Sequence, residues 1–464
     1  MVGENADEVL NRLTSHASIA VRTGGELVGK VKKAEEGDDR RRMAKSKAPL
    51  RRKKDLAPVK GGPSLGGSPS ELLHVLARGI VLDRRGAARG IAEQWGAMKY
   101  CQALVLPDGR GMELSREAQD RTAGYYKAMQ SRELGTAFAL ALVETALLER
   151  HRGHGVSFVP SGVVLRAGWK KLMKHYRPDY FAEVWKPGSP SVVYPVSCKG
   201  SSGAPRSAYG QLASNSAHVE MVRIGEEETP CFIVSTTLPR KGPIEVNALE
   251  GGGSGGQVVC GSASVEKGEL LTDRNLFPEY TVPGRAEVEP ERVSGYYVDP
   301  AHSSWFGRVL ARADAANVAS FAGDDAAATR FLSVRQREHC FLDREEVTAH
   351  DTSVYRSFRV NVQNTALSLG GTSYLGTDHV FRIGSSRIEA FCGVEEDLLT
   401  LLREGDVDGY RSTVYERRLS GGDSGLARSS SVDGEWEGPV SFRADGTILA
   451  VRELGRGTAL LRPM

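Results

Sequence analysis

The stretch Arg177–Ser202, RPDYFAEVWKPGSPSVVYPVSCKGSS, carries the clearest folding signal in the chain. Two β-rich runs, Tyr180–Trp185 and Val192–Cys198, flank a Lys-Pro-Gly-Ser-Pro turn, which predicts a β-hairpin. Each run has a residue capable of chemistry at its end: Asp179 enters the first run directly after a proline, and Lys199 leaves the second directly before a glycine. The rest of the sequence must show whether this hairpin is only structural or is half of a metal-dependent active site.

The segments on both sides of the hairpin complete an α/β unit. Before it, apolar residues recur at helical spacing from Ser131 to Arg150, and a short β-like run covers Val156–Val159. After it, a helix is expected from Ser207 to Met221, and the buried run CFIVSTT begins a strand at Cys231. The order helix, strand, strand, strand, helix, strand predicts one α/β domain over residues 131–245.

Four residues of this unit follow an ordered pattern. Glu133 lies near the start of the first helix, Pro178-Asp179 enters a strand, Lys199 ends the next strand, and Gln211 lies on the second helix. In these residues and their order the chain resembles the PD-(D/E)XK family of metal-dependent nucleases, over residues 131–240. The resemblance implies an α/β fold with a restriction endonuclease-like α-β-β-β-α-β core.

The same resemblance implies a catalytic site. Cutting a phosphodiester needs an activated water and relief of the negative charge on the phosphate, and a hard cation supplies both while taking oxygen ligands. The resemblance implies that Asp179, Glu133 and the main-chain carbonyl of Cys198 hold Mg²⁺ or Mn²⁺. It assigns Lys199 to orient or deprotonate the water and stabilise the developing charge, and Gln211 to position the water or a phosphate oxygen.

Ser197 departs from the family pattern. The family has Asp or Glu at this position, so one negative charge is missing and the affinity for metal is expected to fall. Glu183 shares a strand face with Asp179, but four residues of strand place it about 13 Å away, too far to reach the same ion. His218 lies on the same face of the second helix as the glutamine, where packing is its expected role.

Composition limits the class of protein. A chain of 464 residues with 40% apolar residues can bury a large core and has room for two or three. The longest apolar-rich segment, GTAFALALVETALL from Gly135, contains two Thr and a Glu and is too short to span a bilayer. The six cysteines are scattered singly, which indicates neither a zinc site nor a disulfide framework. Because no signal-peptide pattern is present, a cytoplasmic protein without membrane association is expected.

The net charge of +3 is unevenly distributed, because a segment near the N-terminus is strongly basic. From Lys30 to Lys60, 13 Lys or Arg stand against 5 Asp or Glu, and large apolar residues are almost absent. This composition predicts a disordered basic tail over residues 1–67. Such a tail would bind a phosphate backbone, or would be a solvated segment with no partner.

Three further regions are expected outside the α/β unit. Ser68-Pro69-Ser70-Glu71 has the form of a capping box and opens a helical extension over residues 68–130. A Gly/Ser-rich linker or loop region is expected over residues 246–299. Residues 300–464 are expected to form an α+β domain for target or partner recognition, with a hairpin turn at Asp445-Gly446.

Together these features predict an Mg²⁺-dependent endonuclease that cuts double-stranded DNA, in restriction or another defence against foreign DNA. The alternative is a catalytically degenerate protein of the nuclease fold, which binds nucleic acid or serves as a scaffold subunit. The sequence leaves open whether the chain works as a homodimer or with partner defence subunits.

Overall fold

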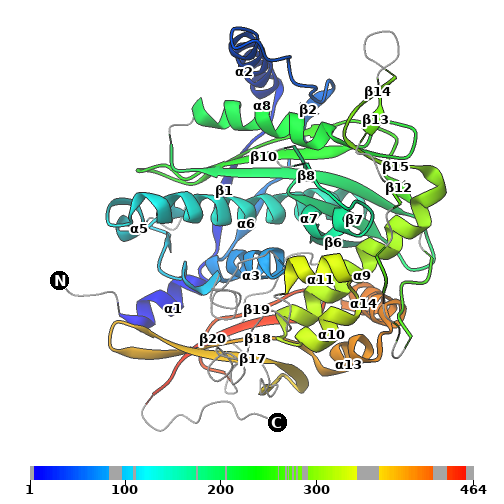
Figure 1. Ribbon diagram of the computed structural model, residues 1–464. Helices are drawn as coiled ribbons and strands as arrows, with labels where there is room; N and C mark the ends of the chain where they lie inside the picture. Colours follow the sequence, from blue (N-terminus) through cyan, green and yellow to red (C-terminus); the bar gives the residue numbers. More distant parts are fainter. Residues whose placement is uncertain are drawn as a thin grey trace, which may run out of the picture.

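The computed structural model shows a mixed α/β protein built around a nine-stranded mixed sheet, with a second, five-stranded antiparallel sheet at the bottom of Figure 1. None of the described helices is both long and apolar enough to cross a membrane. The structure describes residues 5–82, 97–107, 111–173, 176–203, 206–259, 261–266, 269, 271–273, 276–277, 281–284, 291–341, 365–421 and 436–455.

The central sheet follows the strand order β3-β1-β11-β10-β8-β7-β6, and β2 and β12 pair with it off this path. Strands β6, β7 and β8 form an antiparallel meander, β8 and β10 are parallel, and β10 and β11 are antiparallel. The predicted hairpin is therefore the β7–β8 pair. The strand bounds are β1 Ala17–Arg22, β2 Leu56–Pro58, β3 Leu65–Gly67, β6 Gly155–Pro160, β7 Tyr180–Trp185, β8 Ser191–Ser201, β10 Cys231–Thr237, β11 Glu245–Gly251 and β12 Gln257–Val258.

Two helices cover opposite faces of the central sheet, α6 (Gly124–Arg150) on one and α8 (Arg206–Glu220) on the other (Figure 1). Helix α6 approaches β8 closely: a Cβ added at Gly200 would lie 1.7 Å from the carbonyl oxygen of Ser131. Glycine is required there because no other residue permits this backbone contact. The helix begins at Gly124 rather than Ser131, so Glu133 lies well inside it and not near its start.

The prediction of a disordered tail over residues 1–67 is wrong. Helix α1 (Ala6–Thr14), strand β1 and helix α2 (Gly25–Met43) form there, and β1 pairs with β3 on one side and with β11 on the other. Leu27 and Val31 of α2 are buried in a cluster that includes Leu212 of α8. A few well-placed apolar residues are therefore enough to order the segment, because their partners come from elsewhere in the chain.

The basic charge of this segment also has partners that composition does not show. Arg52 is buried and binds Asp38 at 2.6 Å, which neutralises part of the charge locally. Lys53 is buried as well, and its ammonium lies 2.8 Å from the carboxylate of Glu228. A buried cation paired in this way ties the segment to the core instead of leaving it in solvent.

The expected helical extension over residues 68–130 is helical in part. Helix α3 (Pro69–Ile80) begins with the predicted capping box, in which the Ser68 hydroxyl accepts from the Glu71 amide at 3.3 Å and the Glu71 carboxylate accepts from the Ser68 amide at 2.9 Å. The short helix α5 (Arg116–Asp120) follows. Between these helices, β4 (Leu104–Val105) pairs with β5 (Glu113–Leu114).

The prediction of a linker or loop over residues 246–299 is wrong at its start. Residues 246–251 belong to β11, a buried strand of the central sheet that pairs with β10. The strand was not predicted because its sequence, EVNALEG, has few apolar residues and leads directly into the Gly/Ser-rich run. The region also forms β13 (Thr281–Pro283), β14 (Arg292–Ser294) and β15 (Tyr296–Val298), and β15 runs parallel to β9 (Val222–Ile224).

The C-terminal region has the expected α+β composition. The predicted turn is present, since Gly446 has a φ of 81° between the antiparallel strands β19 and β20. This region shares the core of the rest of the chain: the imidazole of His74 in α3 lies 3.0 Å from the hydroxyls of both Ser441 and Thr447. The elements are η2 Pro300–His302, α9 Ser303–Phe321, α10 Asp325–Arg330, α11 Val334–Cys340, β16 Thr365–Leu369, β17 Thr372–Ile383, β18 Ser386–Glu395, α13 Glu396–Glu404, α14 Val407–Gly421, β19 Val440–Phe442 and β20 Thr447–Glu453.

Candidate active site beside strands β7 and β8

Asp179 lies immediately before β7, beside the end of the antiparallel strand β8. Its backbone amide donates to the Val196 carbonyl at 2.9 Å and holds the residue against β8. Its carboxylate oxygen Oδ2 accepts from the Cys198 amide and from the Ser197 hydroxyl, both at 2.9 Å. The strand pairing thus brings the aspartate to the part of β8 that carries Lys199, as the hairpin pattern predicts.

Helix α8 faces this part of β8 with a polar stripe. The Lys199 ammonium donates to the Ser214 hydroxyl at 2.8 Å, and one turn further along the helix His218 Nδ1 lies 3.5 Å from the Ser197 hydroxyl. Both contacts lie on the α8 face of the sheet because residues 197 and 199 point to the same side of the strand. Ser214 and His218 of this stripe are half-buried, as are Asp179 and Lys199 opposite them. The site between the helix and the strand is therefore accessible to a ligand.

Gln211 belongs to the same stripe but is turned toward the neighbouring strand. Its carbonyl oxygen accepts from the Ser235 hydroxyl of β10 at 2.7 Å, and its amide lies 3.5 Å from the Gly200 carbonyl. Asn215, which the sequence pattern did not single out, donates to the carbonyls of Ser197 and Val234 at 3.2 and 2.9 Å. These amides bind α8 to the ends of β8 and β10 and so fix the position of the stripe.

Burial lowers the pKa of both nitrogen bases of the site. Burial lowers the pKa of the Lys199 ammonium, and the nearby Asp179 carboxylate opposes this shift. Burial, reinforced by the positive charge of Lys199, lowers the pKa of His218 to about 4, while Asp179 acts in the opposite direction. The His218 imidazole is therefore neutral at pH 7, and its ring packs edge-on against Tyr176, with ring centroids 5.9 Å apart.

Glu133 lies on the other side of the sheet from this stripe. It belongs to α6, where its carboxylate binds the Lys99 ammonium at 2.7 Å and accepts from the Tyr100 hydroxyl at 2.9 Å. The Cys198 side chain also points to the α6 face, with its sulfur 3.7 Å from the Thr136 hydroxyl. Within the described residues, no group of three or more His, Cys, Asp or Glu side chains is arranged to hold a metal ion.

The Cys198 main chain, in contrast to its side chain, faces the aspartate. The amide of Cys198 points toward Asp179, and the N–H and C=O of one residue leave a strand on the same side. Its carbonyl is therefore on the side where the resemblance places it as a ligand. Glu183 is elsewhere, within β7, where its carboxylate binds Arg411 at 2.6 Å and accepts from the Ser191 hydroxyl at 2.8 Å.

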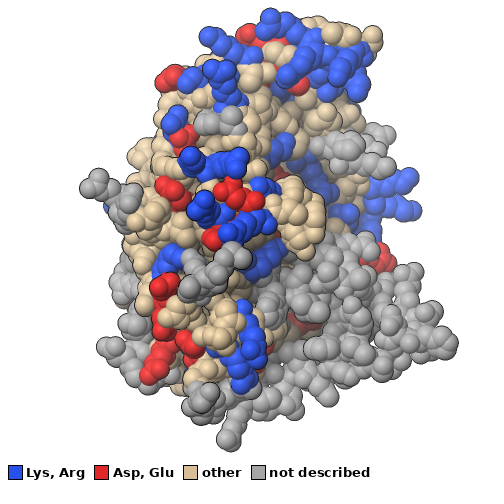
Figure 2. Space-filling model, turned by 90° about the vertical axis from the view of Figure 1, so that its left-hand side faces the viewer, with Lys and Arg blue, Asp and Glu red and all other residues tan. Residues whose placement is uncertain are grey.

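A basic surface adjoins the site. Helix α2 packs on the outside of α8, and the Lys30 ammonium lies 5.3 Å from the centre of the Tyr209 ring. Figure 2 views the side where β8 ends and α8 begins, and it shows Lys and Arg gathered at the top, at the level of α2. We define the basic surface as the exposed cations of α2 and the segment after it: Lys32, Lys33, Arg40, Arg41, Lys45, Lys47 and Lys54.

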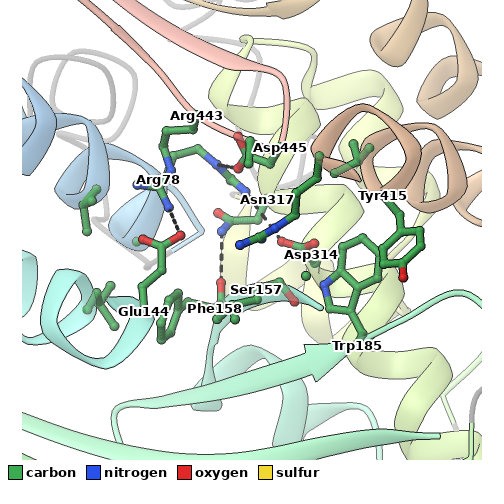
Figure 3. A pocket seen from close by; sticks show the side chains of 18 of the residues that line it. Arg78, Glu144, Ser157, Phe158, Trp185, Asp314, Asn317, Tyr415, Arg443 and Asp445 are labelled. Atoms are coloured by element: carbon green, nitrogen blue, oxygen red, sulfur yellow. Dashed lines mark hydrogen bonds and ion pairs between the residues drawn. The ribbon is translucent and has the colours of Figure 1, made fainter. Parts of the chain in front are cut away.

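A second polar cluster surrounds a cavity of about 50 Å³ between α3, α6, α9 and the β19–β20 turn (Figure 3). Arg78 binds Asp445 at 3.0 Å, and Arg443 binds Glu144 at 2.6 Å. Asp314 lies 3.5 Å from Arg78, and burial raises the pKa of its carboxyl to about 6. None of the site residues predicted from the sequence lines this cavity, whose ion pairs join helices α3 and α6 to the β19–β20 turn of the C-terminal sheet.

Comparisons with protein-family models, curated proteins and solved structures give no match to this chain.

Proposed function

We propose that the chain is a metal-dependent endonuclease that hydrolyses phosphodiester bonds of double-stranded DNA, in restriction or another defence against foreign DNA. The observation that carries this proposal is that the Asp179 carboxylate binds the main chain next to Lys199, where its charge acts on the ammonium, beside the polar stripe of α8. A carboxylate, a lysine with a lowered pKa and a helix-borne amide in one half-buried site are suited to acid–base work on a phosphate.

The order of the elements supports the proposal. Elements α6, β6, β7, β8, α8 and β10 follow one another as helix, strand, strand, strand, helix and strand. Two short elements interrupt this order: helix α7 (Ser161–Arg166) between β6 and β7, and strand β9, which pairs with β15 outside the central sheet, between α8 and β10. In the sheet the four strands lie in chain order, and the parallel pair β8 and β10 is joined through α8. This is the succession expected for a restriction endonuclease-like core.

The residues present fit a divalent cation with a reduced set of ligands. Asp179 and the Cys198 carbonyl would hold Mg²⁺ or Mn²⁺, while Glu133 would first have to leave Lys99. When bound, the cation supplies positive charge against the phosphate and makes water more acidic. Lys199 is held in place by the Ser214 hydroxyl, so that it can take a proton from the attacking water or stabilise the developing charge.

The basic surface supports a polyanionic substrate. Its seven exposed cations lie on α2 and the segment after it, next to the helix that carries the polar stripe. Lys and Arg side chains of this kind bind the phosphate backbone without reading the base sequence. The affinity for DNA then falls steeply as the salt concentration rises. The basic segment would thus act as an ordered part of the DNA-binding face rather than as a flexible arm.

A second candidate function is nucleic-acid binding without cleavage. The ion pair between Glu133 and Lys99 favours it, since this pair occupies the carboxylate that the resemblance assigns to the metal. The serine at position 197 favours it for the same reason, because a hydroxyl brings no negative charge.

Cleavage assays with matched variants test both candidates. Purified protein with plasmid or phage DNA and Mg²⁺ or Mn²⁺ should nick or cut the DNA. Asp179→Ala and Lys199→Ala should abolish cutting, whereas Asp55→Ala and Lys186→Ala, which alter exposed residues of the same types, should not. Equal cutting by the wild type and all four variants would refute the assignment. Retardation of DNA in a gel without any cutting would favour the second candidate.

The basic surface is tested by the salt dependence of binding. Replacing Lys32, Lys33, Arg40 and Arg41 by Ser should weaken DNA binding and make the slope of log affinity against log salt less steep, by roughly 0.9 for each phosphate that the variant no longer neutralises. The control replaces four exposed cations outside the basic surface, Arg152, Lys186, Arg292 and Arg382. The same loss in both variants would show that only net charge matters.

A further inference from the structure

The Ser197 hydroxyl lies between two potential metal ligands. It donates to Asp179 Oδ2 at 2.9 Å and lies 3.5 Å from His218 Nδ1. Position 197 is also where the nuclease pattern has its second acidic residue. The carboxylate and the imidazole therefore flank the place at which the missing negative charge would have acted.

We infer that His218 takes over the ligand role of the missing acid, so that Asp179 and His218 together bind a first-row transition cation such as Mn²⁺ or Co²⁺ in preference to Mg²⁺. This inference rests on the proposed function, which it makes more specific. The Ser197 hydroxyl and the Cys198 carbonyl would add neutral oxygen ligands from the strand.

The position of His218 is well defined by its surroundings. It lies on the polar stripe of α8, one turn after Ser214, and the Asn215 amide between them fixes the helix against both β8 and β10. Tyr176 packs edge-on against the ring. A side chain held in this way needs little reordering to bind an ion, which favours affinity.

The ligand types determine the expected cation preference. Mg²⁺ prefers oxygen ligands in near-ideal octahedral geometry, whereas an imidazole nitrogen suits transition ions. One carboxylate and one imidazole should therefore bind Mn²⁺ and Co²⁺ more tightly than Mg²⁺.

Nucleophilic catalysis by Ser197 is a poorer explanation of the same contacts. The Ser197 hydroxyl donates its proton to Asp179, and the aspartate does not orient the histidine as in a catalytic triad.

Calorimetric titration of the full chain with Mn²⁺ and with Mg²⁺ tests the inference directly. The wild type should bind Mn²⁺ at least about tenfold more tightly than Mg²⁺, and His218→Gln should lose about tenfold or more in Mn²⁺ affinity with little change for Mg²⁺. His154→Gln, which alters a histidine in the turn before β6, is the matched control and should bind both ions as the wild type does. Thermal unfolding of the variants checks that each one is folded.

Cobalt provides a second measurement that does not depend on activity. The visible spectrum of bound Co²⁺ reports its ligands, so His218→Gln should change that spectrum and His154→Gln should not. Mn²⁺ affinity and a Co²⁺ spectrum unchanged in His218→Gln, together with loss of binding in Asp179→Asn, would overturn the inference and leave the proposed function intact. Absence of Mn²⁺, Co²⁺ and Mg²⁺ binding in the wild type would overturn both.

Discussion

The buried ion pair between Glu183 and Arg411 connects the central sheet to the C-terminal helix α14. The Glu183 side chain is fully buried in β7, and the Arg411 guanidinium lies 2.6 Å from its carboxylate and 4.8 Å from the centre of the Trp185 ring. We predict that Arg411→Met will destabilise the whole protein, because it leaves a carboxylate buried without its cation.

The size of the effect follows from the geometry. At 2.6 Å the attraction is about 6 kcal/mol for an effective dielectric constant of about 20, and it is offset by a desolvation cost of several kcal/mol for each ion. The intact pair thus makes almost no net contribution to stability, but removing one partner typically costs about 3–5 kcal/mol. A buried carboxyl can escape this cost by taking up a proton, at about 3.7 kcal/mol for an ordinary Glu at pH 7. We therefore expect a loss of about 3–4 kcal/mol at pH 7.

The same reasoning predicts a pH dependence of the loss. If protonation of the carboxyl limits the stability lost in Arg411→Met, lowering the pH from 7 to 5 should reduce that loss by about 2.7 kcal/mol. The sign follows because a carboxyl that is protonated in the folded state stabilises the protein at low pH and loses that contribution as the pH rises. Urea unfolding followed by far-ultraviolet circular dichroism at both pH values measures the difference.

Two variants complete the experiment. Arg417→Met removes a partly exposed arginine of the same helix that pairs with Glu395 and Asp397, and it should cost less than about 1 kcal/mol. The double variant Glu183→Gln/Arg411→Met should recover most of the stability, since neither charge of this pair remains. A loss below about 1 kcal/mol for Arg411→Met, or an equal loss at pH 5 and pH 7, would refute the reasoning.

Three further predictions concern single positions. Gly200→Ala should lower the free energy of unfolding by about 3 kcal/mol, measured by thermal or urea unfolding, because its Cβ would meet the α6 backbone. The control Gly210→Ala, at an α8 position where an added Cβ meets no atom within 4 Å, should leave stability unchanged or raise it by up to about 1 kcal/mol. Asp314→Asn should be more stable than the wild type by about 3 kcal/mol at pH 8, because the pKa of Asp314 is raised to about 6 and its ionisation opposes folding. This difference in stability should vanish near pH 4, and a difference that does not change with pH would contradict the prediction. Ser197→Asp should raise Mg²⁺ affinity about tenfold or more by calorimetry, and should lower stability without cation by roughly 1 kcal/mol through repulsion of Asp179.

The local signals of the candidate site were sufficient to predict its backbone. Strand periodicity and the Lys-Pro-Gly-Ser-Pro turn predicted the β7–β8 pair, and pairing alone then places Asp179 beside the end of β8. The spacing along α8 likewise predicted that Gln211 and His218 share a face. These features depend on neighbours in sequence, which is why a single chain reveals them.

The sequence could not reveal contacts between distant segments. Glu133 was expected to face the site, but its partners Lys99 and Tyr100 come from a segment whose position no local pattern indicates. Strand β1 has only three apolar positions facing one side, and its neighbour β11 is far along the chain. The 3.5 Å approach of His218 to Ser197 likewise joins a helix to a strand, so the sequence did not predict it.

The place of β1 in the central sheet has a consequence for synthesis on the ribosome. Its parallel partner β11 is translated more than two hundred residues later, which takes on the order of ten seconds or more at cellular rates. During that interval β1 can pair only with β3, so its other edge is open beside a positively charged helix, next to the anionic RNA of the ribosome. Strand β1 is thus paired on both edges only late in synthesis, and factors that shield this segment as it emerges should influence the yield of folded protein.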